Sequence, residues 1–341
     1  NGQSPLHCAA LNGSEDVVKM LLEAKANPSI ADKNKKTPLD VALENCHSKA
    51  VQLLREAVYP KVVPIEANDL SDVELLSTSD LIQTERGLYN GQPVLIETLL
   101  KPSEDALEII RSYAKVEAPF VLPLLAYVPD NPIKIVMPLV SQGNLRDHLN
   151  NERATSSIFT SRFEVAYILA KALQDLHDNQ LVHRDLTSRS IVRVNDSWKL
   201  KLSYFGYTKE LGAQSTVESV EEMLWSAPEV IASNKYTYAS DIYSFGVILS
   251  EMDTWKSPYE ESKLNGFGLM LAIHKGEVQI SLRDNCEPWY RELALRCLNE
   301  NPSLRPKVNE LVEAFKNAAN DPMASKTTSP ISIVEEELLI R

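Results

Sequence analysis

The chain has 341 residues, of which 44% are hydrophobic and 24% charged, so its composition is that of a globular protein with two or three domains. Its formal net charge of −12 argues against nucleic acid or an anionic membrane as the main partner, because both attract basic surfaces. No apolar run reaches the ~18 residues that span a bilayer, and the first residues lack the pattern of a signal peptide. We therefore expect a cytoplasmic protein with protein partners.

The four cysteines are far apart and form no C-x-x-C pair, and the six histidines are equally scattered. This spacing favours neither a zinc site nor a disulfide framework. We expect no metal site and four buried thiols in a reducing compartment. The cysteines are Cys8, Cys46, Cys286 and Cys297.

A pattern near the N-terminus recurs after 33 residues. Ser4-Pro5-Leu6-His7-Cys8-Ala9 returns in form as Thr37-Pro38-Leu39-Asp40-Val41-Ala42. In each copy Ser or Thr suits the cap of a helix that has Pro at its first position. The pattern resembles the ankyrin repeat, whose unit has 33 residues around T-P-L-H-x-A. An unrelated helical hairpin is the alternative.

The resemblance predicts a short all-α stack of about two repeats over residues 1–58, which implies protein binding rather than chemistry. Because roughly three repeats are needed to bury a core, and because the chain begins at Asn1, we expect more repeats upstream. Residues 59–71 contain two prolines and two acidic residues, which is typical of a linker.

Two segments in the second half of the chain indicate a protein kinase fold. His183-Arg184-Asp185-Leu186 is followed by Ser190, and Tyr204-Phe205-Gly206 begins nineteen residues after Asp185. They resemble the catalytic loop H-R-D-L-x-x-x-N and the D-F-G turn of protein kinases. The resemblance is strongest to the tyrosine-kinase-like group of Ser/Thr kinases.

This resemblance implies a two-lobed α+β kinase-like fold, with an N-lobe at residues 72–138 and a C-lobe at 139–317. Residues 318–341, which are rich in Ser and Thr and then acidic, are expected to be a disordered tail. Within the N-lobe, Met137 corresponds to the gatekeeper and Pro138 opens the hinge.

The positions that would bind nucleotide differ from the kinase pattern. Val94-Leu95-Ile96-Glu97 follows the turn Asn90-Gly91 and corresponds to V-A-I-K, so Glu97 replaces the lysine that holds the phosphates. Leu95 replaces the alanine that lies over adenine, and we expect its side chain to fill that space. The three glycines of the phosphate-covering loop correspond to Ser77, Ser79 and Ile82.

The metal-binding positions are changed as well. Ser190 stands where an asparagine binds the second Mg²⁺, and Tyr204 stands where an aspartate binds the first. Asp185, the position of the catalytic base, is retained, and we expect it to serve the structure of the loop rather than catalysis. No ATP or metal cofactor is expected.

Positions that build the kinase fold are retained, in contrast to those that touch nucleotide and metal. Trp225-Ser226-Ala227-Pro228-Glu229 matches the A-P-E region, and the resemblance implies an ion pair between Glu229 and Arg305. It also implies that Asp241 binds the backbone of the catalytic loop. The retained structural positions are His183, Arg184, Phe205, Gly206, Glu229, Asp241 and Arg305, and candidate phosphorylation sites in the activation segment are Ser215, Thr216 and Ser219.

This contrast predicts a catalytically inactive kinase, a pseudokinase, that acts as a signalling scaffold through its ankyrin repeats, its kinase-like surface or both. Three alternatives remain open. The first is a weakly active Ser/Thr kinase that uses Asp185, and the second is a sensor that binds nucleotide without metal. In the third, the kinase-like region only supports the ankyrin repeats.

Overall fold

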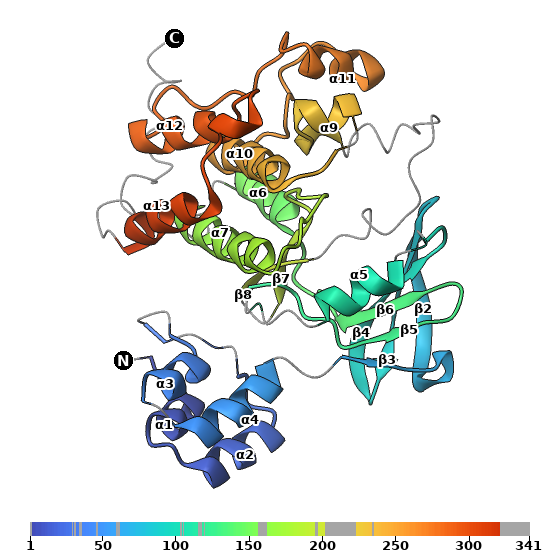
Figure 1. Ribbon diagram of the computed structural model, residues 1–341, viewed down its shortest axis with the longest axis vertical. Coiled ribbons are helices and arrows are strands. Elements are labelled where there is room, and N and C mark those ends of the chain that lie inside the picture. Colours follow the sequence, from blue (N-terminus) through green and yellow to red (C-terminus); the bar gives the residue numbers. More distant parts are fainter. Residues whose placement is uncertain are drawn as a thin grey trace. The chain divides into compact units, whose positions relative to one another are not determined.

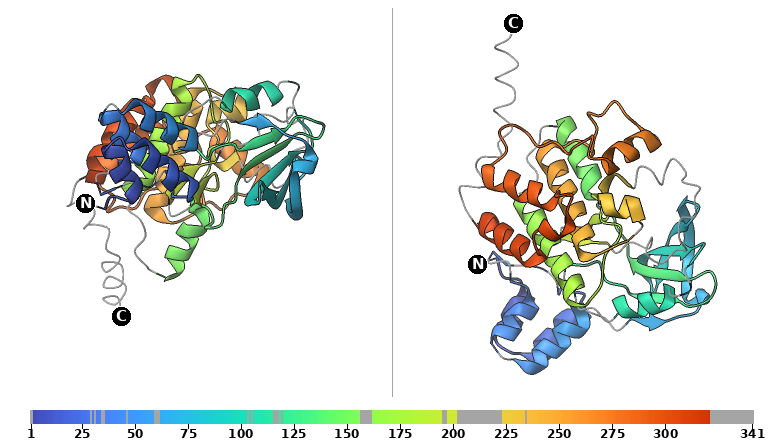
Figure 2. Two further views of the ribbon diagram at one scale, coloured as in Figure 1. Left: turned by 90° about the horizontal axis from the view of Figure 1, so that it is seen from below. Right: turned by 45° about the horizontal axis from the view of Figure 1, so that its top comes forward.

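The structure of the protein is a computed structural model (Figures 1 and 2). It describes residues 2–28, 30, 32–33, 36–45, 47–58, 62–102, 104, 106–114, 118, 120–155, 162–194, 197–201, 223–233 and 235–320. The predicted fold class is confirmed, because a kinase-like sheet and a set of helices follow an all-helical N-terminal segment. The chain divides into two compact units, which are described separately below.

The N-terminal segment is two pairs of helices that form a bundle of their own (Figures 1 and 2). They are α1 (Pro5–Leu11), α2 (Glu15–Glu23), α3 (Pro38–Glu44) and α4 (Ser48–Val58). The predicted caps are present: the Ser4 hydroxyl accepts from the His7 N–H, and the Thr37 hydroxyl accepts from the Asp40 N–H. Small and branched side chains fill the core between the helices, namely Leu6, Ala9, Ala10, Val18, Leu39, Val41, Ala42, Ala50 and Leu54.

His7 ties the two helix pairs together. Its side chain is fully buried, and its Nε2 lies 2.8 Å from the Lys36 carbonyl oxygen, 29 residues along the chain. Its Nδ1 accepts from the Ser4 backbone N–H at 3.1 Å. An imidazole protonated on Nε2 satisfies both bonds, so this histidine connects neighbouring repeats. Cys8, on the same helix, is exposed, which corrects the expectation of four buried thiols.

The same unit contains a six-stranded sheet in the order β1-β5-β6-β4-β3-β2. Its strands are β1 (Val63–Pro64), β2 (Leu70–Thr78), β3 (Ile82–Tyr89), β4 (Gln92–Leu99), β5 (Ala126–Val128) and β6 (Lys134–Pro138). The turn between β3 and β4 is Asn90-Gly91, with φ values of 50° and 69°, as Asn-Gly between apolar runs predicts. Val94 and Ile96 point into the small core on one face of this sheet.

The segment expected to be a linker, residues 59–71, joins the sheet instead in its second part. Val63 and Pro64 pair in parallel with Ala126 and Tyr127 of β5, and the Ile65 N–H donates to the Tyr127 carbonyl oxygen at 2.9 Å. A short 3-10 turn, η1 (Ala67–Asp69), then leads directly into β2. A strand of two residues has no hydrophobic period, which is why the sequence pattern did not predict it.

The second unit is mainly helical. It contains α5 (Ala106–Tyr113), α6 (Leu145–Thr155), α7 (Arg162–Asp178), α9 (Pro228–Ser233), α10 (Tyr238–Thr254), α11 (Gly266–His274), α12 (Pro288–Cys297) and α13 (Val308–Asn320), together with η3 (Met223–Trp225), η4 (Pro302–Leu304) and the hairpin of β7 (Ile191–Val194) and β8 (Ser197–Leu200). The apolar stripe on α7 is buried as predicted, at Leu169, Ala172, Leu173 and Leu176. Helix α13 packs along α7 and continues to Asn320, three residues past the expected end of the C-lobe at residue 317, and residues 321–341 lie outside the described residues.

Helix α10 is the core of this unit, since residues Ser240 to Asp253 are all buried. Gly246 allows α12 to approach it closely, because a Cβ at this position would lie 2.7 Å from the Cβ of Cys297. Cys286 and Cys297 are both buried, free thiols. No helix in the described part of the chain is long and apolar enough to cross a bilayer.

Candidate functional site

Asp241, near the start of α10, organises the catalytic loop. Its Oδ2 accepts from the His183 backbone N–H at 2.9 Å, and its Oδ1 accepts from the Arg184 N–H at 3.1 Å. His177 Nε2 lies 2.9 Å from the same carboxylate. Asp241 is 1% exposed, so this carboxylate satisfies backbone donors that water does not reach. The arrangement is the one that the sequence resemblance implied.

His183 fixes the other side of the loop. Its Nε2 donates to the Lys201 carbonyl oxygen at 3.0 Å, and the Lys201 N–H donates to the Ser190 carbonyl oxygen at 2.7 Å. Burial lowers the pKa of the imidazole, and the nearby Asp241 carboxylate opposes this effect only in part. The ring is therefore neutral at pH 7 and serves as a structural donor.

Asp185 lies in this loop with a half-buried side chain, and the backbone of Arg184 before it is left-handed, with φ at 70°. Tyr236 faces the same place: burial raises the pKa of its hydroxyl, the Asp185 carboxylate raises it further and Arg184 lowers it. A carboxylate, a guanidinium and a phenol therefore gather where kinases hold the base that receives the substrate hydroxyl proton.

Ser190 corresponds to the metal-binding asparagine of the kinase pattern, and its side chain makes its hydrogen bonds within the loop. Its hydroxyl donates to the Thr187 carbonyl oxygen at 2.7 Å and accepts from the Thr187 N–H at 3.0 Å. The side chain is buried, with 8% exposed. Its single hydroxyl thus closes a local turn.

Glu251, which no sequence motif indicated, joins three parts of this unit. This carboxylate is fully buried in α10. Its Oε1 accepts from the Arg146 guanidinium and from the Ser188 hydroxyl, each at 2.9 Å, and its Oε2 accepts from Trp225 Nε1 at 2.6 Å. Glu251 therefore connects α6, the catalytic loop and the A-P-E region. Its partners lie up to 105 residues away in the chain, so no local pattern could have revealed it.

The A-P-E region is held by Arg305, as the resemblance implied. The guanidinium binds both oxygens of Glu229, with Nη1–Oε1 at 2.6 Å and Nη2–Oε2 at 2.8 Å. It also donates to the carbonyl oxygens of Ala239 and Asn299, each at 2.8 Å. The Arg305 side chain has no exposed surface.

The positions predicted to contact nucleotide lie on two neighbouring strands of the sheet, β4 and β6. Leu95 pairs with Met137 and Glu97 with Ile135, while Val94 pairs with Pro138 at the end of β6. Leu95, Glu97 and Met137 are all buried, with 7%, 3% and 1% exposed. Residues 95 and 97 share one face of β4 by strand alternation, opposite the face of Val94 and Ile96. A carboxylate thus occupies the strand position that the kinase pattern gives to lysine.

A second acidic group, which the sequence analysis did not identify, lies on the other face of this sheet. Glu85 of β3 is buried, and its Oε2 accepts from the Thr98 hydroxyl at 3.1 Å and from Lys134 Nζ at 3.0 Å. Lys134 is therefore committed to Glu85, on the face of β4 opposite Glu97.

The positions of the phosphate-covering loop form the tip of the β2–β3 hairpin. Ser77 lies one residue before the end of β2. The Ser79 hydroxyl accepts from the Ile82 N–H at 3.1 Å, and the Ser79 N–H donates to the Ile82 carbonyl oxygen at 2.9 Å. The hydroxyl of Ser79 thus closes the turn itself. Tyr204, Phe205, Gly206, Ser215, Thr216 and Ser219 lie outside the described residues.

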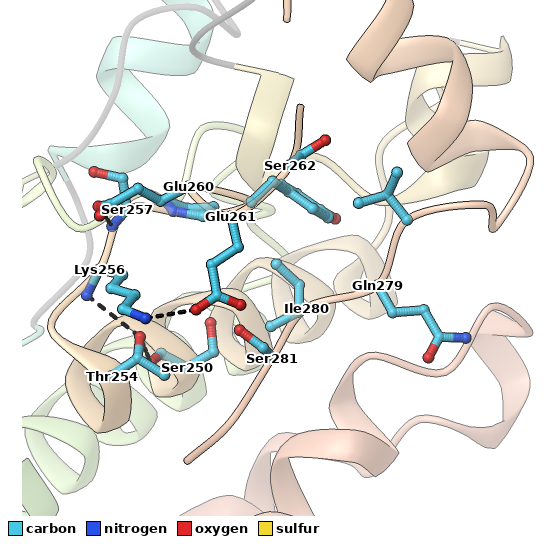
Figure 3. Close-up of a pocket in the computed structure, with 13 residues that line it drawn as sticks. Ser250, Thr254, Lys256, Ser257, Glu260, Glu261, Ser262, Gln279, Ile280 and Ser281 are labelled. Carbon is cyan, nitrogen blue, oxygen red and sulfur yellow. Dashed lines mark hydrogen bonds and ion pairs between the residues drawn. The ribbon is translucent and has the colours of Figure 1, made fainter. Parts of the chain in front are cut away.

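Two other polar clusters in the described part of the second unit were considered as ligand sites. The potential ligand atoms of Asp253, Cys286 and Glu287 lie within 4.8 Å of one another. The Arg162 guanidinium binds both carboxylates and Arg283 also binds Asp253, so cations already neutralise the cluster. A cavity of about 180 Å³ lies beyond the end of α10 and is lined in part by hydroxyl groups. Lys256 and Glu261, which also line it, form an ion pair with an Nζ–Oε1 distance of 2.5 Å (Figure 3). Neither cluster includes the catalytic loop.

Comparison with known proteins agrees with this fold. The protein tyrosine and serine/threonine kinase family matches residues 89–315, about two thirds of the chain, and an ankyrin-repeat family matches residues 1–63. The chain is 27% identical to the serine/threonine/tyrosine-protein kinase HT1 of Arabidopsis thaliana, over 68% of the chain and 62% of that protein. It is 25% identical to the serine/threonine-protein kinase VIK of the same plant, over 92% of the chain and 80% of that protein.

A probable serine/threonine-protein kinase of Dictyostelium discoideum is 26% identical over 73% of the chain, and the chain spans 20% of that relative's length. The chain belongs to the protein tyrosine and serine/threonine kinase family and carries ankyrin repeats at its N-terminus.

Proposed function

We propose that this protein is a pseudokinase of the tyrosine-kinase-like group, a catalytically inactive member of the kinase family that regulates or scaffolds partner proteins by binding them in the cytoplasm. The buried carboxylate of Glu97 carries this proposal. A carboxylate ~4 Å from a phosphate oxygen costs on the order of 4 kcal/mol at an effective dielectric near 20, whereas the lysine of the kinase pattern attracts the phosphate.

The metal positions support the same conclusion. Ser190 uses its hydroxyl within its own turn, and tyrosine at position 204 offers no carboxylate to Mg²⁺. Phosphoryl transfer depends almost wholly on positioned charge, and removing a single stabilising group often costs ~10²–10³ in rate. The loss of lysine, aspartate and asparagine together therefore favours a protein with no ATP or metal cofactor.

The retained anchors explain what such a domain could still do. Asp241, Glu251 and Arg305 hold the catalytic loop and the A-P-E region in place through contacts between protein groups. A rigid surface of this kind, joined to ankyrin repeats, suits protein binding. Under this proposal the ankyrin segment and the kinase-like surface are both binding surfaces.

An active kinase is the second candidate, and Asp185 is the observation that favours it. The aspartate keeps the position of the base, with Arg184 and Tyr236 beside it. The relatives named above are also called kinases. This candidate requires a different group to hold the phosphates.

Thermal unfolding with ATP, with and without Mg²⁺ or Mn²⁺, tests these candidates. A ligand at 100 times its Kd adds about 2.7 kcal/mol to the unfolding free energy. An unchanged Tm in every condition is the result expected of a pseudokinase. A metal-dependent rise would contradict the proposal and, if followed by phosphate transfer that Asp185→Asn abolishes, would establish the kinase. A rise without metal would point to a nucleotide sensor.

A further inference from the structure

The outer strand of the N-terminal sheet combines an open backbone edge with exposed apolar side chains. β2 stands at the end of the strand order, so among the described strands β3 alone lies beside it in the sheet (Figure 1). Val73, Leu75 and Leu76 are 43%, 56% and 50% exposed. An edge strand presents N–H and C=O groups that can pair with a further strand, and natural edges are usually protected against this.

The charge around this edge is predominantly negative. Between Lys61 and Arg86 the sequence has six carboxylates and no Lys or Arg. Arg86 of β3 binds Glu74 at 2.5 Å, but Asp72 has no ion pair among the residues that the structure describes. The strand therefore carries unbalanced negative charge beside its apolar side chains.

The backbone defines which part of β2 is free to pair. Asp72 has a left-handed conformation, with φ at 49°, which interrupts a regular ladder at this residue. Gly87 of β3 packs closely against the start of β2: a Cβ at this position would lie 3.1 Å from the Ser71 carbonyl oxygen and 3.3 Å from Val73 Cγ2. The regular edge for pairing is therefore the stretch from Val73 to Leu76.

We propose that β2 binds an extended, basic segment of a partner protein, which adds to the sheet as a seventh strand alongside Val73–Leu76. Val73 and Leu75 share one face of the strand, so aliphatic residues of the partner pack against them. The alternate residues of the partner lie on the other face, beside Glu74 and Leu76, where the Glu74 carboxylate favours Lys or Arg. This inference stands on the strand alone and holds whether or not the domain transfers phosphate.

The negative charge also argues against a second copy of this chain on the same edge. Pairing β2 with itself would bring together two sets of carboxylates that Arg86 balances only in part, and like charges on neighbouring strands are destabilising. The net charge of −12 favours a basic partner in the same way. The carboxylates thus protect the edge from self-association and leave it open to a strand of opposite charge.

The test uses the full chain and a labelled eight-residue peptide of alternating Val and Lys, with a Val/Glu peptide for comparison. Fluorescence anisotropy measures binding, and hydrogen exchange measures protection of the amides of residues 73–76. We expect the Val/Lys peptide to bind, to slow exchange at these amides and to lose at least about tenfold in affinity in Val73→Thr/Leu75→Thr. The matched control is Leu264→Thr/Leu271→Thr, which removes two exposed leucines from α11 and its preceding loop and should leave affinity unchanged.

Equal binding of the Val/Glu peptide would overturn the proposal, as would binding of Val/Lys that leaves exchange at residues 73–76 unchanged. The mass in solution tests the second copy: a dimer of the wild-type chain that Leu75→Lys converts to a monomer would assign the edge to self-association instead. Because none of these readouts involves nucleotide, they can fail or succeed independently of the pseudokinase assignment.

Discussion

The Arg305 guanidinium binds both carboxylate oxygens of Glu229, at 2.6 Å and 2.8 Å, although the two residues are 76 positions apart in the sequence. The guanidinium is fully buried, while the carboxylate is 24% exposed. A bidentate pair of this kind fixes orientation as well as distance. It joins the start of α9 to the segment before α13 and holds the A-P-E region against the rest of the unit.

Removing this guanidinium should destabilise the protein severely. Arg305→Ala leaves the Glu229 carboxylate and two backbone carbonyl groups without their donor, and breaking a buried pair typically costs ~3–5 kcal/mol. Urea unfolding monitored by tryptophan fluorescence measures the loss.

The control is Arg296→Ala, which removes an ion pair with Glu310 at 2.7 Å whose side chains are 44% and 49% exposed. An exposed pair is worth only ~0.2–1 kcal/mol. If both variants unfolded at the same urea concentration as the wild type, the structural importance assigned to Arg305 would be wrong.

Asp241 gives a second prediction, about the catalytic loop alone. In Asp241→Ala the N–H groups of His183 and Arg184 lose their acceptor, and each unsatisfied buried donor costs ~1–3 kcal/mol. We expect the amides of these two residues to exchange faster with solvent, together with a lower Tm. Hydrogen exchange followed by mass spectrometry reads this directly.

Ser190→Ala is the matched control in the same loop, because it removes the side-chain bonds to Thr187 while the Asp241 bonds remain. It should leave the exchange of residues 183 and 184 unchanged. Equal effects of the two variants would contradict the anchoring role of Asp241.

Restoring the kinase residues should restore nucleotide binding, if the charge at these positions is what excludes it. The triple variant Glu97→Lys/Ser190→Asn/Tyr204→Asp supplies the phosphate-binding cation and both metal ligands of the kinase pattern. We expect a metal-dependent rise of Tm with ATP in this variant and none in the wild type.

Glu97→Gln separates repulsion from lost attraction, because it removes the negative charge without adding a positive one. We expect it to give a smaller effect than Glu97→Lys. A triple variant that folds normally and still ignores ATP would show that another feature, such as the side chain of Leu95, blocks the site.

The fourth prediction concerns pH. Burial raises the pKa of Glu152, on α6, from 4.5 to about 7. Between these values the folded state keeps a proton that the unfolded state releases, so unfolding becomes more favourable as pH rises from about 4.5 to 7. Glu152→Gln lacks this titration, and its stability relative to the wild type should therefore increase from pH 5 to pH 8.

Urea unfolding at pH 5, 6, 7 and 8 measures this difference, with Glu313→Gln, an exposed position on α13, as the control. We expect the control to follow the wild type at every pH. A constant difference between Glu152→Gln and the wild type over this range would contradict the raised pKa.

The sequence by itself determined the features that depend on neighbouring residues or on a recurring motif. Ser4 and Thr37 begin helices, and Asn90-Gly91 forms the predicted turn, because caps and tight turns are set by a few consecutive residues. The 33-residue period predicted the ankyrin repeats, and the spacing between Asp185 and Tyr204-Phe205-Gly206 predicted the kinase-like region.

Only the tertiary structure decided which polar groups meet over long distances. Glu251 joins Arg146 and Trp225, and Glu85 joins Lys134, with separations that no local period encodes. The sequence around Val63 does not predict its pairing with β5 either, because the hydrogen bonds that stabilise this short strand come from the partner strand. Long-range contacts depend on the path of the whole chain, whereas caps and turns are made within a few residues of each other.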